Sequence, residues 1–311
     1  MEKISEINAI TAYKVFDENF CCRDFQYEVG KSYHEDNEIE LCRNGFHACR
    51  NPLEVLSYGY EMSTSRFAEV ELWGDVDECD SIVSCASDIK IIRELSLKEL
   101  IILGYEFASN NKSVSSNNTD NRYMENILSI SDNDEISSCG PNNTITVNGL
   151  SSRVSSIGEY TKIFSKGMDS LVSQLGNNGV VSLLNSDIRA FSCGYRSKVA
   201  ILGGYNKVDS SGSESELVSF GYNNILCSSG GDSKVLSNGE KCIVVSVGAM
   251  SKAKAKKGNW ITLAEWKYKD GDMFPINVKT EYVDGEHIKE DTWYKLKNGE
   301  FVESNENCKN A

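Results

Sequence analysis

Long apolar runs are absent from this 311-residue chain. No segment of 18 consecutive apolar residues occurs, so the sequence offers no candidate for a transmembrane helix. Its first residues, MEKISEINAI, lack the apolar segment of a signal peptide, and we therefore expect a cytoplasmic protein that does not engage a membrane. In that compartment the 11 cysteines should stay reduced, because disulfides are rare there.

Positive charge is also scarce, with 32 lysine and arginine residues against 46 aspartate and glutamate residues. The acidic excess lies mainly in residues 1–125, which hold 24 acidic and 12 basic side chains, whereas residues 126–258 hold 11 and 13. Affinity for nucleic acid depends on clustered lysine and arginine, so we expect no direct nucleic-acid binding. An acidic domain that mimics the charge of phosphate is an alternative.

Standard metal motifs are missing as well, since no C-x2-C pair exists. Cys22, Cys42, His47 and Cys49 offer zinc ligands but with irregular spacing, and we interpret them as buried thiols and a structural histidine. Calcium-binding nonapeptide rolls carry an aspartate in each repeat, and nearly every repeat of this chain lacks it. We therefore expect no metal and no cofactor.

What the sequence does contain is glycine at every ninth position from Gly140 to Gly248, interrupted only by Asn185. Thirteen consecutive nonapeptides in one register predict a repeat array. We number each repeat from 1 to 9, with this glycine at position 1. Asparagine is the residue that best replaces glycine at positive φ, so the series predicts that the position-1 glycine opens a turn with positive φ.

Polarity alternates within each repeat. Position 6 is apolar in all thirteen repeats, as in Val199 and Val208, and positions 4 and 8 are mostly serine or asparagine. Because side chains alternate across a strand, positions 4, 6 and 8 should face inward and positions 5, 7 and 9 outward. Nine residues cannot enclose a core, so we expect two repeats per coil of a thin parallel β-solenoid. Inward serine and asparagine should form hydrogen-bonded ladders between coils.

Several of the outward positions 7 and 9 are apolar, and an exposed apolar stripe usually marks an interface. We therefore predict that these positions form a homo-oligomer or bind a partner protein, with cover by the chain's own flanking domains as the alternative. The predicted interface residues are Phe164, Leu175, Leu184, Phe191, Leu202, Val218, Phe220 and Leu236.

The predicted fold class is mainly β, with three structured parts. Residues 1–106 should form an acidic α+β domain, residues 131–258 the solenoid, and residues 259–311 a β-hairpin cap on its last coil. Residues 107–130 are polar and form either a linker or degenerate first coils.

Local signals place elements in the flanking parts. Asn51 should cap a helix that begins at Pro52, and Ser96 begins a capping box. Asn298-Gly299 predicts a hairpin turn. Strands are predicted at Ala12–Phe16, Phe25–Val29, Phe67–Trp73 and Ile89–Arg93. Three tryptophans should cover the core of the last coil: Trp260, Trp266 and Trp293.

Three segments carry a family resemblance: AYKVFDENF from residue 12, CRNGFHACRNPLEVL from residue 42 and RFAEVELWG from residue 66. Together they resemble an uncharacterised domain of bacterial and phage proteins, over about residues 10–100. That resemblance implies a phage or prophage origin and attaches no activity to the domain.

The order of elements in this domain is also similar to that of ADP-ribosyltransferases. That second likeness would form a nicotinamide pocket from an early strand, a G-F-H segment and a late glutamate. The corresponding residues are Tyr13 or Lys14, then Phe46 and His47, then Glu69, Glu71 or Glu94. No firm signature motif accompanies it, so we assign no catalytic residue.

These observations favour a non-catalytic, protein-binding scaffold that forms a homo-oligomer. With the phage resemblance, the specific hypothesis is an inhibitor or decoy of a defence complex of the host cell, which makes a host protein the expected partner. One alternative is a structural component of a virion or surface. The other is an ADP-ribosyltransferase-like enzyme on the N-terminal domain.

Overall fold

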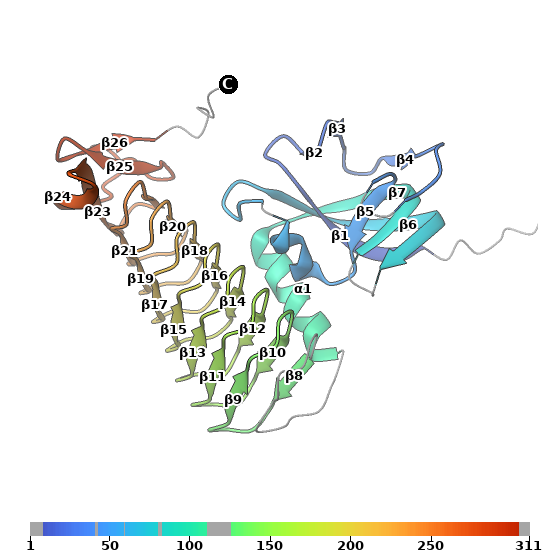
Figure 1. Ribbon diagram of the computed structural model, residues 1–311, viewed down its shortest axis with the longest axis horizontal. Helices are drawn as coiled ribbons and strands as arrows, with labels where there is room; N and C mark the ends of the chain where they lie inside the picture. The colour runs from blue at the N-terminus through green and yellow to red at the C-terminus, as the bar shows by residue number, and fades with distance from the viewer. Residues whose placement is uncertain (1–8, 41–42, 59, 80–82, 111–125, 305–311) are drawn as a thin grey trace, which may run out of the picture. The chain divides into compact units, whose positions relative to one another are not determined.

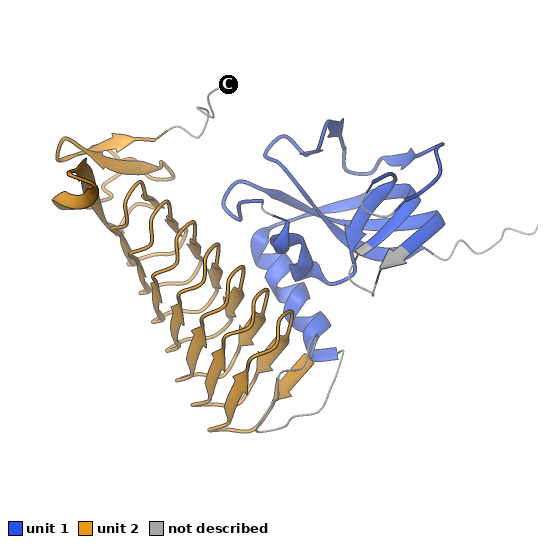
Figure 2. Cartoon of the chain, viewed as in Figure 1, with its two compact units in different colours: residues 1–110 blue, residues 111–311 orange. Residues whose placement is uncertain are grey.

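The computed structural model describes residues 9–40, 43–58, 60–79, 83–110 and 126–304, apart from a few side chains. The chain divides into two compact units, residues 1–110 and residues 111–311 (Figure 2). It is mainly β, with a parallel solenoid of about 8 turns after the N-terminal domain, as the sequence predicts. Within the described ranges, no helix combines the length and the apolar character that a membrane crossing requires.

The first unit is built on an antiparallel sheet of order β4-β7-β5-β1-β6, in which β6 also pairs with β7, so the sheet closes on itself. Its core packs apolar side chains such as Phe16, Val70 and Ile91. The elements are β1 Ile10–Phe16, β2 Cys21–Cys22, β3 Phe25–Gln26, β4 Ser32–His34, β5 Phe46–Cys49, the 3-10 helix η1 Pro52–Ser57, β6 Arg66–Cys79, β7 Val83–Leu95 and the α-helix α1 Leu97–Asn110.

Both predicted helix starts are confirmed. The side chain of Asn51 accepts a 3.1 Å hydrogen bond from the main-chain nitrogen of Leu53, at the start of η1. Ser96 and Glu99 form a reciprocal capping box at α1, in which each side chain accepts a hydrogen bond from the main-chain nitrogen of the other residue. The strand predicted at Phe25–Val29 is shorter than expected and ends at Gln26.

The second unit winds into coils of two strands each, as the nonapeptide pattern predicts (Figure 1). Strands pair in parallel with the strand 18 residues away, for example Val181 with Val199 and Val208 with Leu226. One sheet contains β8 Asn126–Ser129, β10 Thr144–Val147, β12 Lys162–Ser165, β14 Val180–Leu183, β16 Lys198–Ile201, β18 Glu216–Ser219, β20 Lys234–Ser237 and β22 Lys252–Ala255. The other contains β9 Glu135–Ser138, β11 Arg153–Ser156, β13 Leu171–Gln174, β15 Arg189–Ser192, β17 Lys207–Ser210, β19 Ile225–Ser228, β21 Ile243–Ser246 and β23 Trp260–Lys269.

The inward assignment of positions 4, 6 and 8 is confirmed. The aliphatic side chains of position 6, among them Val199 and Val208, are buried and form one continuous core along the unit. The first strand, β8, pairs with β10 in the same register, so the array begins before residue 131. In the region predicted as a linker or degenerate coils, residues 111–125 lie outside the described residues.

The prediction that the position-1 glycine opens a turn with positive φ is wrong. No position-1 glycine from Gly149 to Gly248 is among the residues with positive φ, and the left-handed residue of each turn is instead position 3. Position 1 requires glycine because an added Cβ would overlap the carbonyl oxygen of the residue one coil earlier. The position-3 residues have φ between 52° and 62°, and they are Asn133, Asn142, Ser151, Tyr160, Asp169, Asn178, Asp187, Arg196, Tyr205, Glu214, Asn223, Asp232, Lys241 and Met250.

The predicted side-chain ladders are well formed at position 4 and sparse at position 8. The amide of Asn206 donates to the main-chain oxygen of Asn185, and that of Asn224 donates to Gly203, each from one coil to the previous one. At position 8, Ser192 donates to the side-chain oxygen of Gln174 in the previous coil at 3.4 Å, whereas the buried hydroxyls of Ser210 and several equivalent serines make no hydrogen bond to any described residue. Inter-coil bonding therefore rests mainly on the main chain and on position 4.

The solenoid ends in antiparallel hairpins. β24 Asp272–Tyr282 pairs with β23, and β25 Tyr294–Lys297 pairs with both β22 and β26 Glu300–Glu303. The predicted Asn298-Gly299 turn is present, and both of its main-chain nitrogens donate to the carboxylate of Glu265. These hairpins cover the last coil with Val283, Ile288 and Leu296.

The prediction that Trp260 covers this core is wrong. Trp260 occupies the outward position of β23 and is 47% exposed, while the inward neighbours Ile261 and Leu263 are fully buried. Trp293 is buried, and the indole nitrogen of Trp266 donates to the main-chain oxygen of Val247.

Candidate functional site

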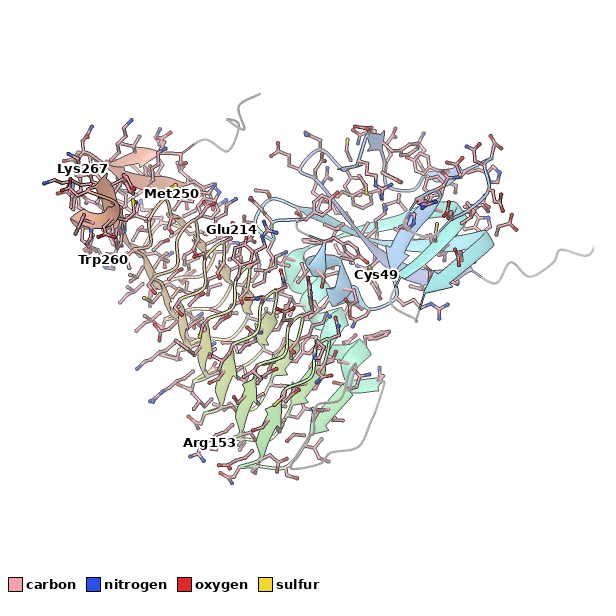
Figure 3. All side chains as sticks on the ribbon, in the orientation of Figure 1. Cys49, Arg153, Glu214, Met250, Trp260 and Lys267 are labelled. Carbon is pink, nitrogen blue, oxygen red and sulfur yellow. The ribbon has the colours of Figure 1, made fainter. Side chains whose placement is uncertain are left out.

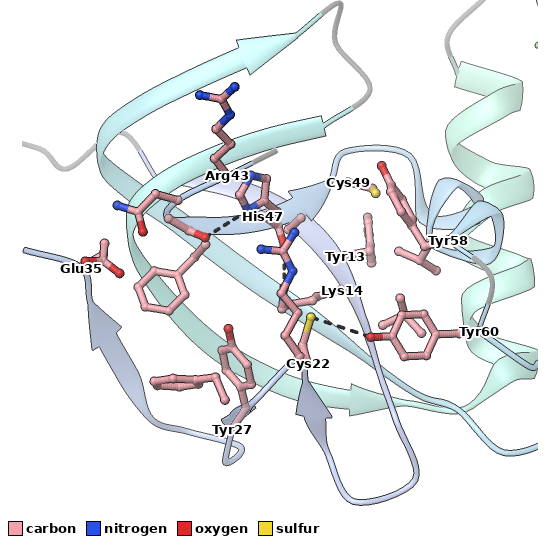
Figure 4. Close-up of a pocket in the computed structure, with 18 residues that line it drawn as sticks. Tyr13, Lys14, Cys22, Tyr27, Glu35, Arg43, His47, Cys49, Tyr58 and Tyr60 are labelled. Carbon is pink, nitrogen blue, oxygen red and sulfur yellow. Dashed lines mark hydrogen bonds between the residues drawn. The ribbon is translucent and has the colours of Figure 1, made fainter. Parts of the chain in front are cut away.

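The first unit contains a cavity of about 420 Å³ beside β1 and β5 (Figure 4). Aromatic, cationic and sulfur-containing side chains line it, and they come from the end of β1, the β2–β3 hairpin, β5 and the segment after η1. The lining includes Tyr13, Lys14, Cys22, Arg23, Phe25, Tyr27, Arg43, Phe46, His47, Tyr58 and Tyr60.

Lys14 is the buried cation of this cavity. It shares a face of β1 with Ala12 and Phe16, both buried, and only 6% of its own surface is exposed. Its ammonium Nζ donates a 2.8 Å hydrogen bond to the main-chain oxygen of His47 and lies 5.5 Å from the ring centre of Tyr27. Burial lowers the pKa of Lys14, since the charged form loses water.

A thiol and two phenols lie around this ammonium (Figure 4). The hydroxyl of Tyr60 donates a weak hydrogen bond to the sulfur of Cys22 at 4.0 Å. Burial raises the pKa of Tyr60 to about 12 and also raises that of Tyr27 well above its ordinary value. Both phenols therefore stay protonated at neutral pH and present hydroxyl groups, without negative charge, near Lys14.

Two arginines add to the positive charge. Arg23 stands in the hairpin between β2 and β3 with a φ of 55°, and its side chain makes no hydrogen bond or ion pair with another described residue. Arg43 pairs with Glu40 at 2.8 Å. Glu35 is the acidic residue that lines the same cavity.

His47 is held by the main chain. Its Nδ1 atom lies 3.0 Å from the oxygen of Gly45. Burial, followed by the nearby charge of Lys14, lowers the pKa of His47, so its ring is neutral at pH 7.

Of the four residues that offer zinc ligands in the sequence, the structure places three around one cavity. Cys22, His47 and Cys49 all line the cavity, whereas Cys42 lies outside the described residues. Over the part of the chain that the structure describes, no cluster of three or more histidine, cysteine, aspartate or glutamate side chains is arranged to hold a metal ion.

The residues of the ADP-ribosyltransferase likeness separate into two groups. Tyr13, Lys14, Phe46 and His47 all line the cavity. The cavity lining does not include the three candidate glutamates, Glu69, Glu71 and Glu94. Two of them pair with arginines on the neighbouring strand: Glu69 with Arg93 at 2.9 Å and Glu94 with Arg66 at 2.6 Å.

The eight predicted interface residues of the solenoid lie on both of its sheets. In or just after the strands of the β8–β22 sheet, three are buried, namely Phe164, Val218 and Leu236, and three are half-buried, namely Leu184, Leu202 and Phe220. On the opposite sheet, Phe191 in β15 is 40% exposed and Leu175, just after β13, is 42% exposed.

An exposed apolar surface that the sequence reasoning missed lies at the C-terminal end of the β9–β23 sheet (Figure 3). Ile225, Ile243 and Trp260 are paired in register at position 5 of successive coils, and Tyr282 stands opposite Trp260 in β24. We call these four residues, together with Val278, which lies four residues before Tyr282 on the same face of β24, the Trp260 surface. Its signal in the sequence is that position 5 of the repeats on this sheet, basic at Arg189 and Lys207, is apolar at Ile225 and Ile243.

Comparison with known proteins characterises the first unit only. Residues 10–103 match the family model described as a domain of unknown function, DUF7666. Neither the curated proteins nor the solved structures contain a significant match to the chain. The chain therefore carries a DUF7666 domain at residues 10–103, followed by a C-terminal β-solenoid.

Proposed function

We propose that this chain is a non-catalytic, protein-binding scaffold that contacts its partner through the Trp260 surface. The observation that carries the proposal is the exposure of its side chains, which is 38% for Ile225, 41% for Ile243, 47% for Trp260, 43% for Tyr282 and 62% for Val278. Four of these side chains, those of Ile225, Ile243, Trp260 and Tyr282, follow one another in register, and clustered exposed apolar side chains often mark an interaction site.

The edge of the same sheet supports this proposal. Among the described residues, β24 is the last strand of its sheet and pairs on one side only, with β23. Edge strands present unpaired main-chain donors and acceptors that a strand of a partner can extend. Phe274 and Ile276 in β24, each 48% exposed, would add apolar contacts to such pairing.

The narrower version of the proposal makes the partner a host defence complex, with this chain as an inhibitor or decoy encoded by a phage or prophage. A homo-oligomer formed through the solenoid, as in a virion or surface component, is the alternative. The two versions differ in what binds the Trp260 surface, because the first requires a foreign protein and the second requires another copy of the chain.

Affinity capture with matched variants tests the proposal. The tagged 34.5 kDa chain is compared with Ile225→Ser/Ile243→Ser, and with the control Arg153→Ser/Arg189→Ser, which changes the same repeat position in earlier coils. We expect wild type and control to retain the same stoichiometric partner and the apolar variant to lose it. Retention of an unchanged set of proteins by the apolar variant would contradict a role for this surface.

The native mass of the purified chain separates the two versions. A multiple of the single-chain mass that falls to one chain in Ile225→Ser/Ile243→Ser supports the homo-oligomer. A single-chain mass together with a captured host complex supports the inhibitor. A monomer that captures nothing would reject the scaffold in both versions.

A further inference from the structure

We propose that the cavity of the DUF7666 domain binds a small organic anion that carries a planar ring. This is a ligand site in the first unit, separate in its residues from the protein-binding surface proposed above. The inference rests on three properties of the cavity, which are a buried cation without a counter-ion, a free arginine and a wall of aromatic rings.

The buried cation is Lys14. It forms no ion pair with any described residue, and none of the groups that perturb its pKa is a carboxylate. A buried charge without an opposite charge is costly, and this cost is what lowers the pKa of Lys14. Its side-chain nitrogen lines the cavity and donates hydrogen bonds to the main-chain oxygen of His47 and to the sulfur of Cys22. An anionic group in the cavity would supply the missing charge.

The free arginine strengthens the preference for an anion. Arg23 lines the same cavity and has no partner among the described residues, so its planar guanidinium is available for a carboxylate or phosphate group. Arg43 also lines the cavity but is paired with Glu40, so Lys14 and Arg23 are its unpaired cations among the described residues, against the acidic lining residue Glu35. This positive lining contrasts with residues 1–125 as a whole, which hold 24 acidic and 12 basic side chains.

The aromatic wall favours a planar ring (Figure 4). Phe25, Tyr27 and Phe46 line the cavity, and their ring centres lie 4.7 to 6.3 Å apart. Tyr58 and Tyr60 line it from the segment after η1. Phe25 is 42% exposed, so part of its ring is open to solvent at the cavity. Stacking against these rings would orient a planar group while the cations hold its charge.

Size limits the ligand further. A volume of about 420 Å³ is within the range of small-molecule sites and accommodates one ring system with one anionic group. A nucleoside monophosphate and an aryl carboxylate share this chemistry, and the experiment distinguishes them.

Calorimetric titration of the full chain provides the test. The probes are adenosine monophosphate and indole-3-carboxylate. The controls are adenosine, which has the ring without the anionic group, and inorganic phosphate, which has the negative charge without a ring. We expect one of the two complete probes to bind at one site per chain, about tenfold or more tighter than either control. Binding of the nucleotide alone indicates a nucleotide site, and binding of the carboxylate alone indicates an aryl-acid site. Failure of both complete probes to bind would overturn the proposal.

Variants assign the binding to the cavity. Arg23→Met changes an exposed side chain and should weaken binding about tenfold or more, whereas Arg93→Met, in the same domain but outside the cavity, should leave it unchanged. Lys14→Met should abolish binding and, because it removes an unpaired buried charge, raise the melting temperature of the ligand-free protein. Unchanged affinity in Arg23→Met would overturn the assignment, and so would a fall in melting temperature in Lys14→Met with binding intact.

Discussion

Gly221 lies directly against Gly203 of the previous coil, and a methyl group on Gly221 would overlap the carbonyl oxygen of Gly203. Gly221→Ala should therefore destabilise the solenoid by about 3 kcal/mol or more, because the overlap is with the main chain and cannot be relieved by a rotamer change. Gly231→Ala is the matched control, since its new Cβ would meet no atom closer than 3.5 Å. Denaturant unfolding followed by circular dichroism measures both, and equal midpoints would contradict the close-approach explanation.

Met250 stands at the left-handed position of its turn with φ of 60° and is 80% exposed. Its side chain packs against little, while its backbone bears the cost of a conformation that L-residues disfavour. Met250→Gly should therefore stabilise the solenoid by about 0.5–1 kcal/mol, after allowance for the larger entropy loss of glycine. Asn223→Gly serves as the control and should have a smaller effect, because asparagine tolerates this conformation. A lower melting temperature for Met250→Gly would reject the argument.

Two neighbours on β17 test the inward assignment. Val208 is 1% exposed in the core, whereas Lys207 points outward. Val208→Asp should cost about 4 kcal/mol or more and unfold the coils around it, because it buries an unpaired carboxylate. Lys207→Asp introduces the same group one residue earlier and should change stability by less than about 0.5 kcal/mol. Melting curves that coincide for the two variants would disprove the alternation.

The pKa values of His34 and His47, both in the first unit, should be shifted in opposite directions from the ordinary imidazole value. The hydrogen bond of His34 to Asp88, at 2.8 Å, raises the pKa of His34, whereas burial lowers that of His47. Protonated His34 thus contributes stability below the ordinary imidazole pKa, and this contribution is lost as the pH rises through the raised value. NMR titration of the ring protons measures both pKa values. Asp88→Asn should return only His34 to the ordinary range, and a common pKa in wild type would contradict these environments.

The solenoid is predictable from sequence because its information is local and repeated. Each nonapeptide shows the same alternation of polar and apolar residues. The two strands per coil and the inward direction of Val199 can therefore be inferred from the repeat alone. The role of the position-1 glycine does not follow, because it depends on an atom 18 residues away in sequence. A series of glycines is equally compatible with positive φ and with close approach, and only the packed coils distinguish these two reasons.

The cavity was harder to predict because its residues come from separated segments. The alternation of Ala12, Lys14 and Phe16 in β1 does place the lysine on the buried face, and this is the signal that was available. Nothing local indicates that Arg23 would reach the same space, since this depends on how the β2–β3 hairpin folds over the sheet. The outward direction of Trp260 depends in a similar way on its register with Ile243.

The pairing of each solenoid strand from β8 to β20 with the strand 18 residues later also restricts how the chain can change in length. Insertion or deletion of two nonapeptides would move the C-terminal hairpins by one coil and leave their orientation about the long axis nearly unchanged. A change of one nonapeptide would instead exchange the two sheets for all later residues and turn the Trp260 surface to the opposite side. Relatives of different length that bind the same partner should therefore differ by whole coils.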